Sequence, residues 1–255
     1  MNTTLYDLEG KKVKTIELPS QFSADYEPVL IKRALLVLEN HQKKYGAMPG
    51  AGVIGVSGKI SRRRRNYKGS YGLGVSRVPR KILWKRGTQF GWVGTQVSGT
   101  VKGRRAHPPK AEKNFDLKIN KKERKKAIRS ALSGIAIQQK IMILESPFET
   151  LKKSKEVKTL FEKLGFGKEL LRLQDTKIRS GKGKNRGRKY VSKKGPLLVV
   201  ADVCPLQHAA HNMNGVDIVT VKNLNVGLLT RGNELRQTLW TENAIKKIAM
   251  EKIFQ

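Results

Sequence analysis

Leu197-Leu-Val-Val-Ala201 and Val216-Asp-Ile-Val-Thr-Val221 are two short runs rich in apolar and β-branched residues. Between them, residues 206–213 form a stretch that favours a helix. A strand, a helix and a second strand in this order indicate parallel strands, because parallel neighbours need a crossover connection. We therefore expect an α/β fold in which a parallel sheet is covered by helices.

Further strands and helices are predicted outside this stretch from the spacing of apolar residues. Apolar alternation or short apolar runs predict strands at residues 13–18, 141–144 and 170–173. Apolar residues three and four positions apart predict helices at residues 27–45, 120–136, 151–164 and 241–253. Asn120 with Glu123 resembles a capping box, and Thr241 is the expected N-cap of the last helix.

The charge of the chain is large and unevenly distributed. The 255 residues contain 53 Lys and Arg against 20 Asp and Glu, a formal net charge of +33. No acid lies between Glu39 and Glu112, a span of 72 residues with 17 basic ones, and residues 177–195 hold 9 more and again no acid. The other 164 residues carry 27 basic and 20 acidic side chains, so most of the net charge belongs to two segments.

Several classes of protein are excluded by composition. No apolar run approaches the roughly 18–20 residues that cross a bilayer, and the first residues lack a signal-peptide pattern. We therefore expect a cytoplasmic protein. The single cysteine, Cys204, excludes an intramolecular disulfide framework and a structural zinc site with several thiolates.

The apolar residues of the first acid-free span follow neither a helical nor a strand period. Thirteen glycines between residues 46 and 103 alternate with arginines, lysines and five aromatic residues. Loops beyond roughly 12–15 residues are uncommon in compact domains unless they are functional or disordered. We expect one very long extended Gly/Arg-rich loop at residues 46–110.

Two glycine motifs in this loop match phosphate-binding patterns only in part. Gly50-Ala-Gly52-Val-Ile-Gly55 has the dinucleotide-binding spacing, but a helix and Pro49 precede it and no acid follows until Glu112. Gly58-Lys59 suggests a phosphate loop, but Val53 and Ile60 occupy positions that require Gly and Ser or Thr. We expect no nucleotide cofactor.

Cys204, His208 and His211 lie within eight residues. They admit a nucleophile with its base, a pair of metal ligands, or a small buried cysteine beside two surface histidines. The last interpretation is favoured, since free cysteine commonly behaves as a small core residue and Pro205 interrupts the spacing.

The two basic segments point to RNA. Mutual repulsion among so many cations is relieved by a polyanion, and glycines let the backbone approach phosphates. The tyrosines and tryptophans of the loop can stack on unpaired bases. A basic recognition helix for DNA and a basic amphipathic helix for membranes are both missing from the pattern.

Specific motifs resemble one family. Val101-Lys-Gly-Arg-Arg-Ala-His-Pro-Pro-Lys110, Lys121-Lys-Glu-Arg124 and Ala127-Ile-Arg-Ser-Ala-Leu132 are similar to the universal large-subunit ribosomal protein number four family, in its archaeal and eukaryotic form. Asp175-Thr-Lys-Ile178, Gly187-Arg-Lys-Tyr190, Gly195-Pro196 and Thr241-Glu-Asn-Ala-Ile245 resemble it too. The resemblance covers essentially the whole chain.

The resemblance implies a Rossmann-like α/β body, a single domain over residues 1–255, with residues 46–110 as an rRNA-penetrating loop and 177–195 as a second rRNA-binding segment. The loop tip, near residues 68–80, would line the constriction of the nascent-polypeptide exit tunnel and meet large-subunit protein number twenty-two. The tunnel-lining candidates are Tyr71, Gly72, Leu73, Gly74 and Arg77.

The interpretation that these features favour is a non-catalytic structural constituent of the large ribosomal subunit that binds its rRNA. The candidate rRNA-binding residues are Arg62, Arg63, Arg64, Arg65, Lys68, Arg77, Arg80, Lys81, Lys85, Arg86, Arg104, Arg105, Arg179, Lys182, Lys184, Arg186, Arg188 and Lys189. The alternative is an rRNA-modifying enzyme, such as a methyltransferase, which needs an acidic ribose ligand after a strand's glycine turn. The sequence offers no such acid.

Overall fold

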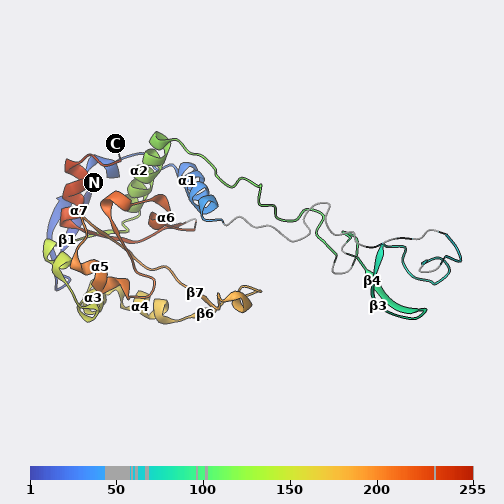
Figure 1. The fold of residues 1–255 in the computed structure, drawn as a ribbon. Helices are drawn as coiled ribbons and strands as arrows, with labels where there is room; N and C mark the ends of the chain where they lie inside the picture. Colours follow the sequence, from blue (N-terminus) through green and yellow to red (C-terminus); the bar gives the residue numbers. More distant parts are fainter. Residues whose placement is uncertain are drawn as a thin grey trace. The chain divides into compact units, whose positions relative to one another are not determined.

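The computed structural model describes residues 1–43, 58, 60, 63–66, 69–95, 97–100, 103–232 and 234–254. The chain divides into two compact units (Figure 1). Unit 1 comprises Met1–Asn40 and Leu117–Gln255, and unit 2 comprises His41–Asp116. Within the described part of the chain, no helix is long and apolar enough to cross a membrane.

Unit 1 is built on a six-stranded sheet in the order β2-β1-β5-β12-β8-β9. Its strands are β1 (Asn2–Tyr6), β2 (Lys12–Glu17), β5 (Ile141–Leu144), β8 (Leu197–Val200), β9 (Asp217–Thr220) and β12 (Thr238–Thr241). Neighbouring strands from β1 to β9 are parallel, and only β2 joins the edge antiparallel to β1. The predicted α/β fold with a parallel sheet is confirmed.

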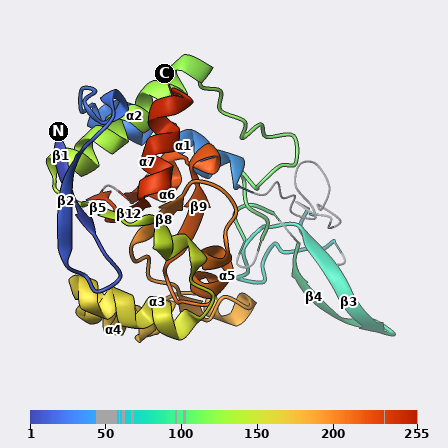
Figure 2. The same ribbon diagram turned by 90° about the vertical axis from the view of Figure 1, so that its left-hand side faces the viewer.

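Helices cover both faces of this sheet (Figures 1 and 2). One face packs against α1 (Pro28–His41), α2 (Lys121–Ile137), α6 (Val226–Leu229) and α7 (Glu242–Met250). The other packs against α3 (Ser154–Phe161), α4 (Gly167–Gln174) and α5 (Pro205–His211). Short helical turns complete the unit: η1 (Ser20–Phe22), η2 (Ser146–Thr150), η3 (Glu162–Phe166), η4 (Lys184–Arg186) and η5 (Val221–Asn223).

Strand β8 shows why its sequence is apolar without interruption. Leu197 and Val199 contribute to the core on the α2 side, while Leu198 and Val200 contribute to the core on the α5 side. Successive side chains of a strand point to opposite faces, so a strand buried on both faces must be apolar at every position. All four side chains are buried.

Helix ends follow the predictions in one case and depart from them in another. The Thr241 hydroxyl accepts a hydrogen bond from the Ala244 amide at the start of α7, which confirms this N-cap. Asn120 precedes α2, but its side chain makes no capping hydrogen bond. Glu123 instead forms an ion pair with Arg33 at 2.8 Å, so the predicted capping box is wrong.

The strand predicted at residues 170–173 is also wrong, because this segment belongs to α4. Leu170 and Leu173 are both buried, and their spacing of three places them on one helical face. The helix predicted at residues 151–164 is shorter than expected, since α3 ends at Phe161 and the chain continues into the π-helical η3. Likewise, α1 ends at His41 rather than near residue 45.

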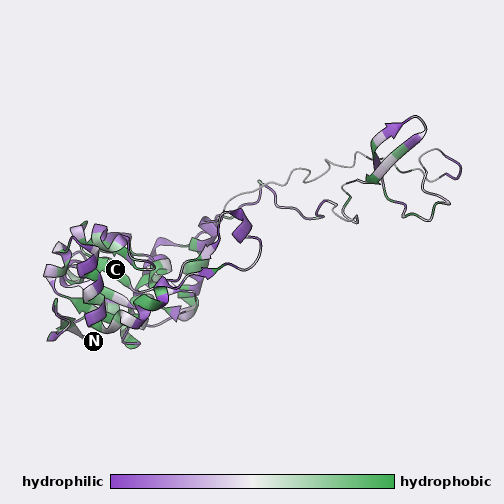
Figure 3. Ribbon diagram, turned by 90° about the horizontal axis from the view of Figure 1, so that it is seen from below, coloured by the Kyte–Doolittle hydropathy of each residue, from purple (hydrophilic) through white to green (hydrophobic). Residues whose placement is uncertain are grey.

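Unit 2 contains a hairpin of β3 (Arg80–Arg86) and β4 (Gln89–Gly94), which the sequence analysis missed. Its turn is Gly87-Thr88, and Gly87 has a φ of 59°. A glycine with positive φ at the first position of a two-residue loop matches the right-handed twist of a hairpin. Figure 3 shows polar and apolar segments on both strands. The glycine string at residues 50–55 and Lys59 lie outside the described residues.

Candidate nucleic-acid interface

Residues 177–195 of unit 1 form a small hairpin whose tip carries five cations. Its two strands, β6 (Lys177–Ile178) and β7 (Tyr190–Val191), pair Ile178 with Tyr190. Gly181 and Gly187 take positive φ values and turn the backbone on either side of η4. The exposed cations, none paired with an acid in the described structure, are Lys182, Lys184, Arg186, Arg188 and Lys189. An arrangement of this kind attracts phosphates.

Arg179 differs from the other predicted cations of this hairpin, because its guanidinium is already used within the protein. Its Nε donates to the Arg188 carbonyl at 3.1 Å, and Nη2 lies 3.5 Å from the Tyr190 carbonyl. The Arg179 amide donates to the Lys189 carbonyl at 2.8 Å. Arg179 thus connects the two sides of the hairpin and holds its neighbouring cations in place.

The base of the hairpin is fastened to the body by residues that the sequence analysis did not select. Lys193 Nζ binds Asp175 Oδ2 at 2.6 Å, and Arg172 Nη2 donates to the Lys194 carbonyl at 2.8 Å while also pairing with Glu169. The hydrogen bond from Lys193 lowers the pKa of Asp175 below its usual value. The base of the hairpin is therefore held by one ion pair and by one hydrogen bond to its backbone.

Arg236 is the buried centre of this attachment. It is 3% exposed and donates to the carbonyls of Gly195, Pro196 at 3.1 Å and Gly215 at 3.0 Å, while Nη1 binds Asp217 Oδ2 at 2.6 Å. Burial lowers the pKa of Arg236, and the hydrogen bond with Asp217 opposes that shift. No local sequence signal marks this residue, since Asp217 and Gly195, two of its partners, lie 19 and 41 positions away.

In unit 2, the β3–β4 hairpin brings four predicted cations together. Lys81, Lys85 and Arg86 are exposed, and Arg80 lies over the Trp92 ring with its guanidinium carbon 4.9 Å from the ring centre. Phe90 meets Trp92 edge to face at 5.4 Å between centroids. The Arg80 side chain is thus partly engaged by an aromatic ring, whereas the other three reach solvent.

The remaining predicted cations of unit 2 lie in turns and irregular segments. Arg63, Arg64 and Arg65 are exposed, and Arg65 has a φ of 57°. Arg104 is half-buried and its Nη1 lies 3.5 Å from the carbonyl of Arg105, which is exposed. The other two candidates, Arg62 and Lys68, lie outside the described residues.

The five tunnel-lining candidates fall on one turn of unit 2 and the residues that follow it. Gly72 and Gly74 have φ values of 81° and 67°, conformations that glycine adopts without strain. Leu73 between them is 62% exposed. The Arg77 guanidinium lies 4.3 Å from the centre of the Tyr71 ring, a cation–π distance that connects the start of this turn to the segment after it.

Cys204 does not have the environment of a nucleophile. Burial raises the pKa of its thiol, so the thiol stays protonated near neutral pH. His208 and His211 are exposed on α5. Among the residues that the structure describes, no group of three or more His, Cys, Asp or Glu side chains is arranged to hold a metal ion.

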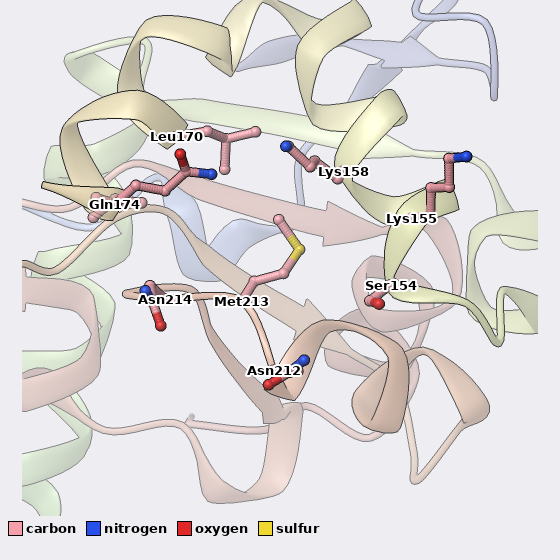
Figure 4. Close-up of a pocket in the computed structure, with 9 residues that line it drawn as sticks. Ser154, Lys155, Lys158, Leu170, Gln174, Asn212, Met213 and Asn214 are labelled. Atoms are coloured by element: carbon pink, nitrogen blue, oxygen red, sulfur yellow. The ribbon is translucent and has the colours of Figure 1, made fainter.

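A pocket of about 330 Å³ tests the alternative of a cofactor-dependent enzyme (Figure 4). Met213 points into the space framed by Leu170, Gln174 and Lys158. Asn212 and Asn214, which also line it, precede β9, so the pocket lies near the amino end of that strand. Cofactors of open parallel sheets bind beyond the carboxyl ends and need an acid for the ribose, and this lining contains no acid. The pocket does not fit a methyl-donor cofactor.

Comparison with known proteins identifies the family. The family described as "Ribosomal protein L4/L1 family" matches residues 16–251. The chain is 44% identical to "Large ribosomal subunit protein uL4" of Nanoarchaeum equitans over 268 residues, covering 100% of both chains. It is 39% identical to the protein of that name from Methanocaldococcus jannaschii, covering 97% of this chain and 98% of the relative.

A third relative from Archaeoglobus fulgidus, also named "Large ribosomal subunit protein uL4", is 37% identical over 96% of this chain and 97% of its own length. These full-length matches confirm the resemblance drawn from the motifs and its archaeal form. The chain belongs to the ribosomal protein L4/L1 family, a family of ribosomal proteins and not of enzymes.

Proposed function

We propose that this protein is a structural constituent of the large ribosomal subunit in the cytoplasm and binds large-subunit rRNA through two sets of cations. The family match and the names of the archaeal relatives support the placement in the subunit. The observation that carries the rRNA-binding role is the β6–β7 hairpin, where Lys182, Lys184, Arg186, Arg188 and Lys189 are exposed and without an acidic partner among the described residues.

Phosphate neutralisation is the physical basis of this role. Each Lys or Arg that meets a phosphate releases condensed counterions, so many such contacts give affinity that falls steeply with salt. Most of these contacts position the protein and carry no base information. The attachment of the hairpin through Arg236 and Lys193 favours binding, because less conformational entropy is lost when the cations are already held in one arrangement.

We further propose that residues 46–110 act as the rRNA-penetrating loop inserted in a single α/β domain. Tyr71, Gly72, Leu73, Gly74 and Arg77 would line the narrow part of the exit tunnel, facing the nascent polypeptide and large-subunit protein number twenty-two. The exposed Leu73 and the paired Tyr71 and Arg77 support this role, since they offer apolar, aromatic and charged surface on one short turn.

Sedimentation tests the proposal directly. The native protein is expected to co-sediment with large subunits and to resist release at moderate salt, and the purified chain is expected to bind large-subunit rRNA with a steep salt dependence. A weak dependence of the affinity on salt would show that the basic segments are not the binding surface. Stoichiometric binding of a methyl donor, or turnover of an RNA substrate, would contradict a purely structural role.

A further inference from the structure

We propose that Trp84 in the β3–β4 hairpin is a stacking platform for one unpaired RNA base. This inference rests on the proposed rRNA binding by unit 2 and assigns the base contact to one side chain. Aromatic side chains contribute to binding of single-stranded RNA by stacking, whereas cations contribute through phosphates. The sequence suggested base stacking for the tyrosines and tryptophans of the loop as a group, without singling out Trp84.

The geometry around Gly91 orients the Trp84 ring. Trp84 pairs with Gly91 across the hairpin, so both positions belong to one face of the two-stranded sheet. A Cβ atom at Gly91 would lie 2.2 Å from Trp84 Nε1 and 2.7 Å from Cε2, which shows that the indole occupies the space above the glycine. Even so, Trp84 is 56% exposed. The ring therefore rests on backbone on one side and is open to solvent on the other.

The opposite face of the hairpin has no comparable open ring. Phe90 and Trp92 pack edge to face there, and the Arg80 guanidinium covers Trp92. Trp92 is half-buried as a result. Of the two tryptophans in the hairpin, only Trp84 presents a ring that a flat ligand can cover.

The charges beside Trp84 select the ligand. Lys81 lies opposite Val93 in the hairpin, and Arg86 lies opposite Gln89. Val93 and Gln89 are each two residues from Gly91 on β4, so Lys81 and Arg86 lie on the same face of the hairpin as Trp84. Both are exposed, and the sequence from residue 40 to residue 111 contains no acid. A flat ring between two cations is complementary to a nucleotide, whose base stacks while its flanking phosphates meet Lys81 and Arg86.

The test uses the full-length chain and a short single-stranded oligoadenylate, with an abasic strand of equal length and charge as the matched ligand. Lys182, Lys184 and Arg186 are replaced by Gln in the background so that unit 2 dominates the titration. Trp84→Ala is expected to weaken oligoadenylate binding by about 5- to 150-fold, which corresponds to the roughly 1–3 kcal/mol of one base–aromatic stack. Abasic-strand affinity and the salt slope should not change.

Two controls keep the result interpretable if Trp84→Ala disturbs the hairpin. Leu83→Ala removes a neighbour of similar exposure, 61%, and should leave oligoadenylate binding unchanged. In a Trp92→Phe variant, the remaining tryptophans are Trp84 and the fully buried Trp240, so oligoadenylate should quench the emission of Trp84. Quenching reports stacking without any change at Trp84 itself.

The outcomes separate this inference from the proposed function. Unquenched emission, or equal oligoadenylate affinity of Trp84→Ala and its parent, overturns the stacking role. If Lys81→Gln and Arg86→Gln still reduce the affinity and the salt slope in that case, rRNA binding by unit 2 stands without a base stacked on Trp84. If none of these variants changes binding, rRNA binding by the hairpin fails as well.

Discussion

Arg236 illustrates that a basic residue in an RNA-binding protein need not meet RNA. Its guanidinium is buried and its donors are directed at carbonyls of residues 195, 196 and 215 and at Asp217. The sequence alone does not distinguish Arg236 from the exposed arginines of the chain. In the folded protein it stabilises the junction between the β6–β7 hairpin and strands β8 and β9.

Replacing Arg236 with Met is expected to lower the free energy of unfolding by about 3–5 kcal/mol, because the change leaves buried carbonyls and the Asp217 carboxylate without their donor. Urea unfolding followed by far-ultraviolet circular dichroism measures this loss. Arg231→Met is the matched control, since Arg231 is exposed. Equal stabilities of the two variants would mean that the buried hydrogen bonds contribute little.

The Asp175–Lys193 pair makes a prediction about pH. The hydrogen bond from Lys193 holds the pKa of Asp175 below 3.8, its ordinary value. A carboxyl whose folded pKa is depressed stabilises the fold above its unfolded pKa, and that contribution is lost as the pH falls through the lower folded pKa. Titration of Asp175 by NMR should show a midpoint below 3.8 that returns toward 3.8 in Lys193→Met. An unchanged midpoint in that variant would assign the shift to another cause.

The β6–β7 hairpin combines a backbone held by its own hydrogen bonds with exposed cations. Arg179 holds the frame, whereas Lys182, Lys184 and Arg186 are exposed on and beside the η4 turn. The cations at the tip can therefore be changed without removing a hydrogen bond that the fold needs.

Substituting Gln for Lys182, Lys184 and Arg186 together is expected to reduce rRNA affinity and to lower the salt slope by about 0.7–0.9 for each phosphate that is no longer neutralised. The melting temperature should stay the same. A control triple variant carries Gln at Lys152, Lys163 and Lys168, exposed lysines of unit 1 outside the two acid-free segments. A similar reduction of the slope in both variants would indicate general charge attraction instead of a defined surface.

Much of the fold was predictable because short-range patterns determined it. The runs at 141–144, 197–201 and 216–221 are apolar enough to indicate buried strands, and each one contributes a strand to the sheet. Strand β12 was not predicted, because two of its four residues are threonines, which are polar side chains but are buried in this sheet. The β3–β4 hairpin was not predicted, because a bulge between Ile82 and Trp84 interrupts the alternation of inward and outward side chains. The Gly87-Thr88 sequence was nevertheless a signal for its turn.

The site was predictable in composition but not in detail. Runs of cations without acids identify the segments that favour RNA, and five of the six residues selected on the β6–β7 hairpin are exposed. The division between phosphate-binding and internal roles, as between Lys184 and Arg179, depends on hydrogen bonds that form only after the chain has turned back on itself. Trp84 lies over Gly91 and keeps an exposed face, whereas Trp92 is covered by Phe90 and Arg80.

Both hydrophobic cores formed by the described residues lie in unit 1. Deleting residues 68–80 should therefore leave the cooperative unfolding transition of the body in place and preserve part of the rRNA affinity. Differential scanning calorimetry checks the transition, and a gel-shift assay checks the affinity. Loss of cooperative unfolding would show that this segment is needed to hold the α/β body together.

The anchored β6–β7 hairpin has a consequence for the speed of assembly. Because Arg236, Arg172 and Lys193 hold its base in the free protein, a cluster of positive charge is displayed in one geometry before RNA arrives. Productive collisions with a polyanion then need no folding step, and electrostatic attraction accelerates them. We expect this hairpin to make the first lasting contact with a precursor subunit, so that the order in which the segments engage is determined by folding.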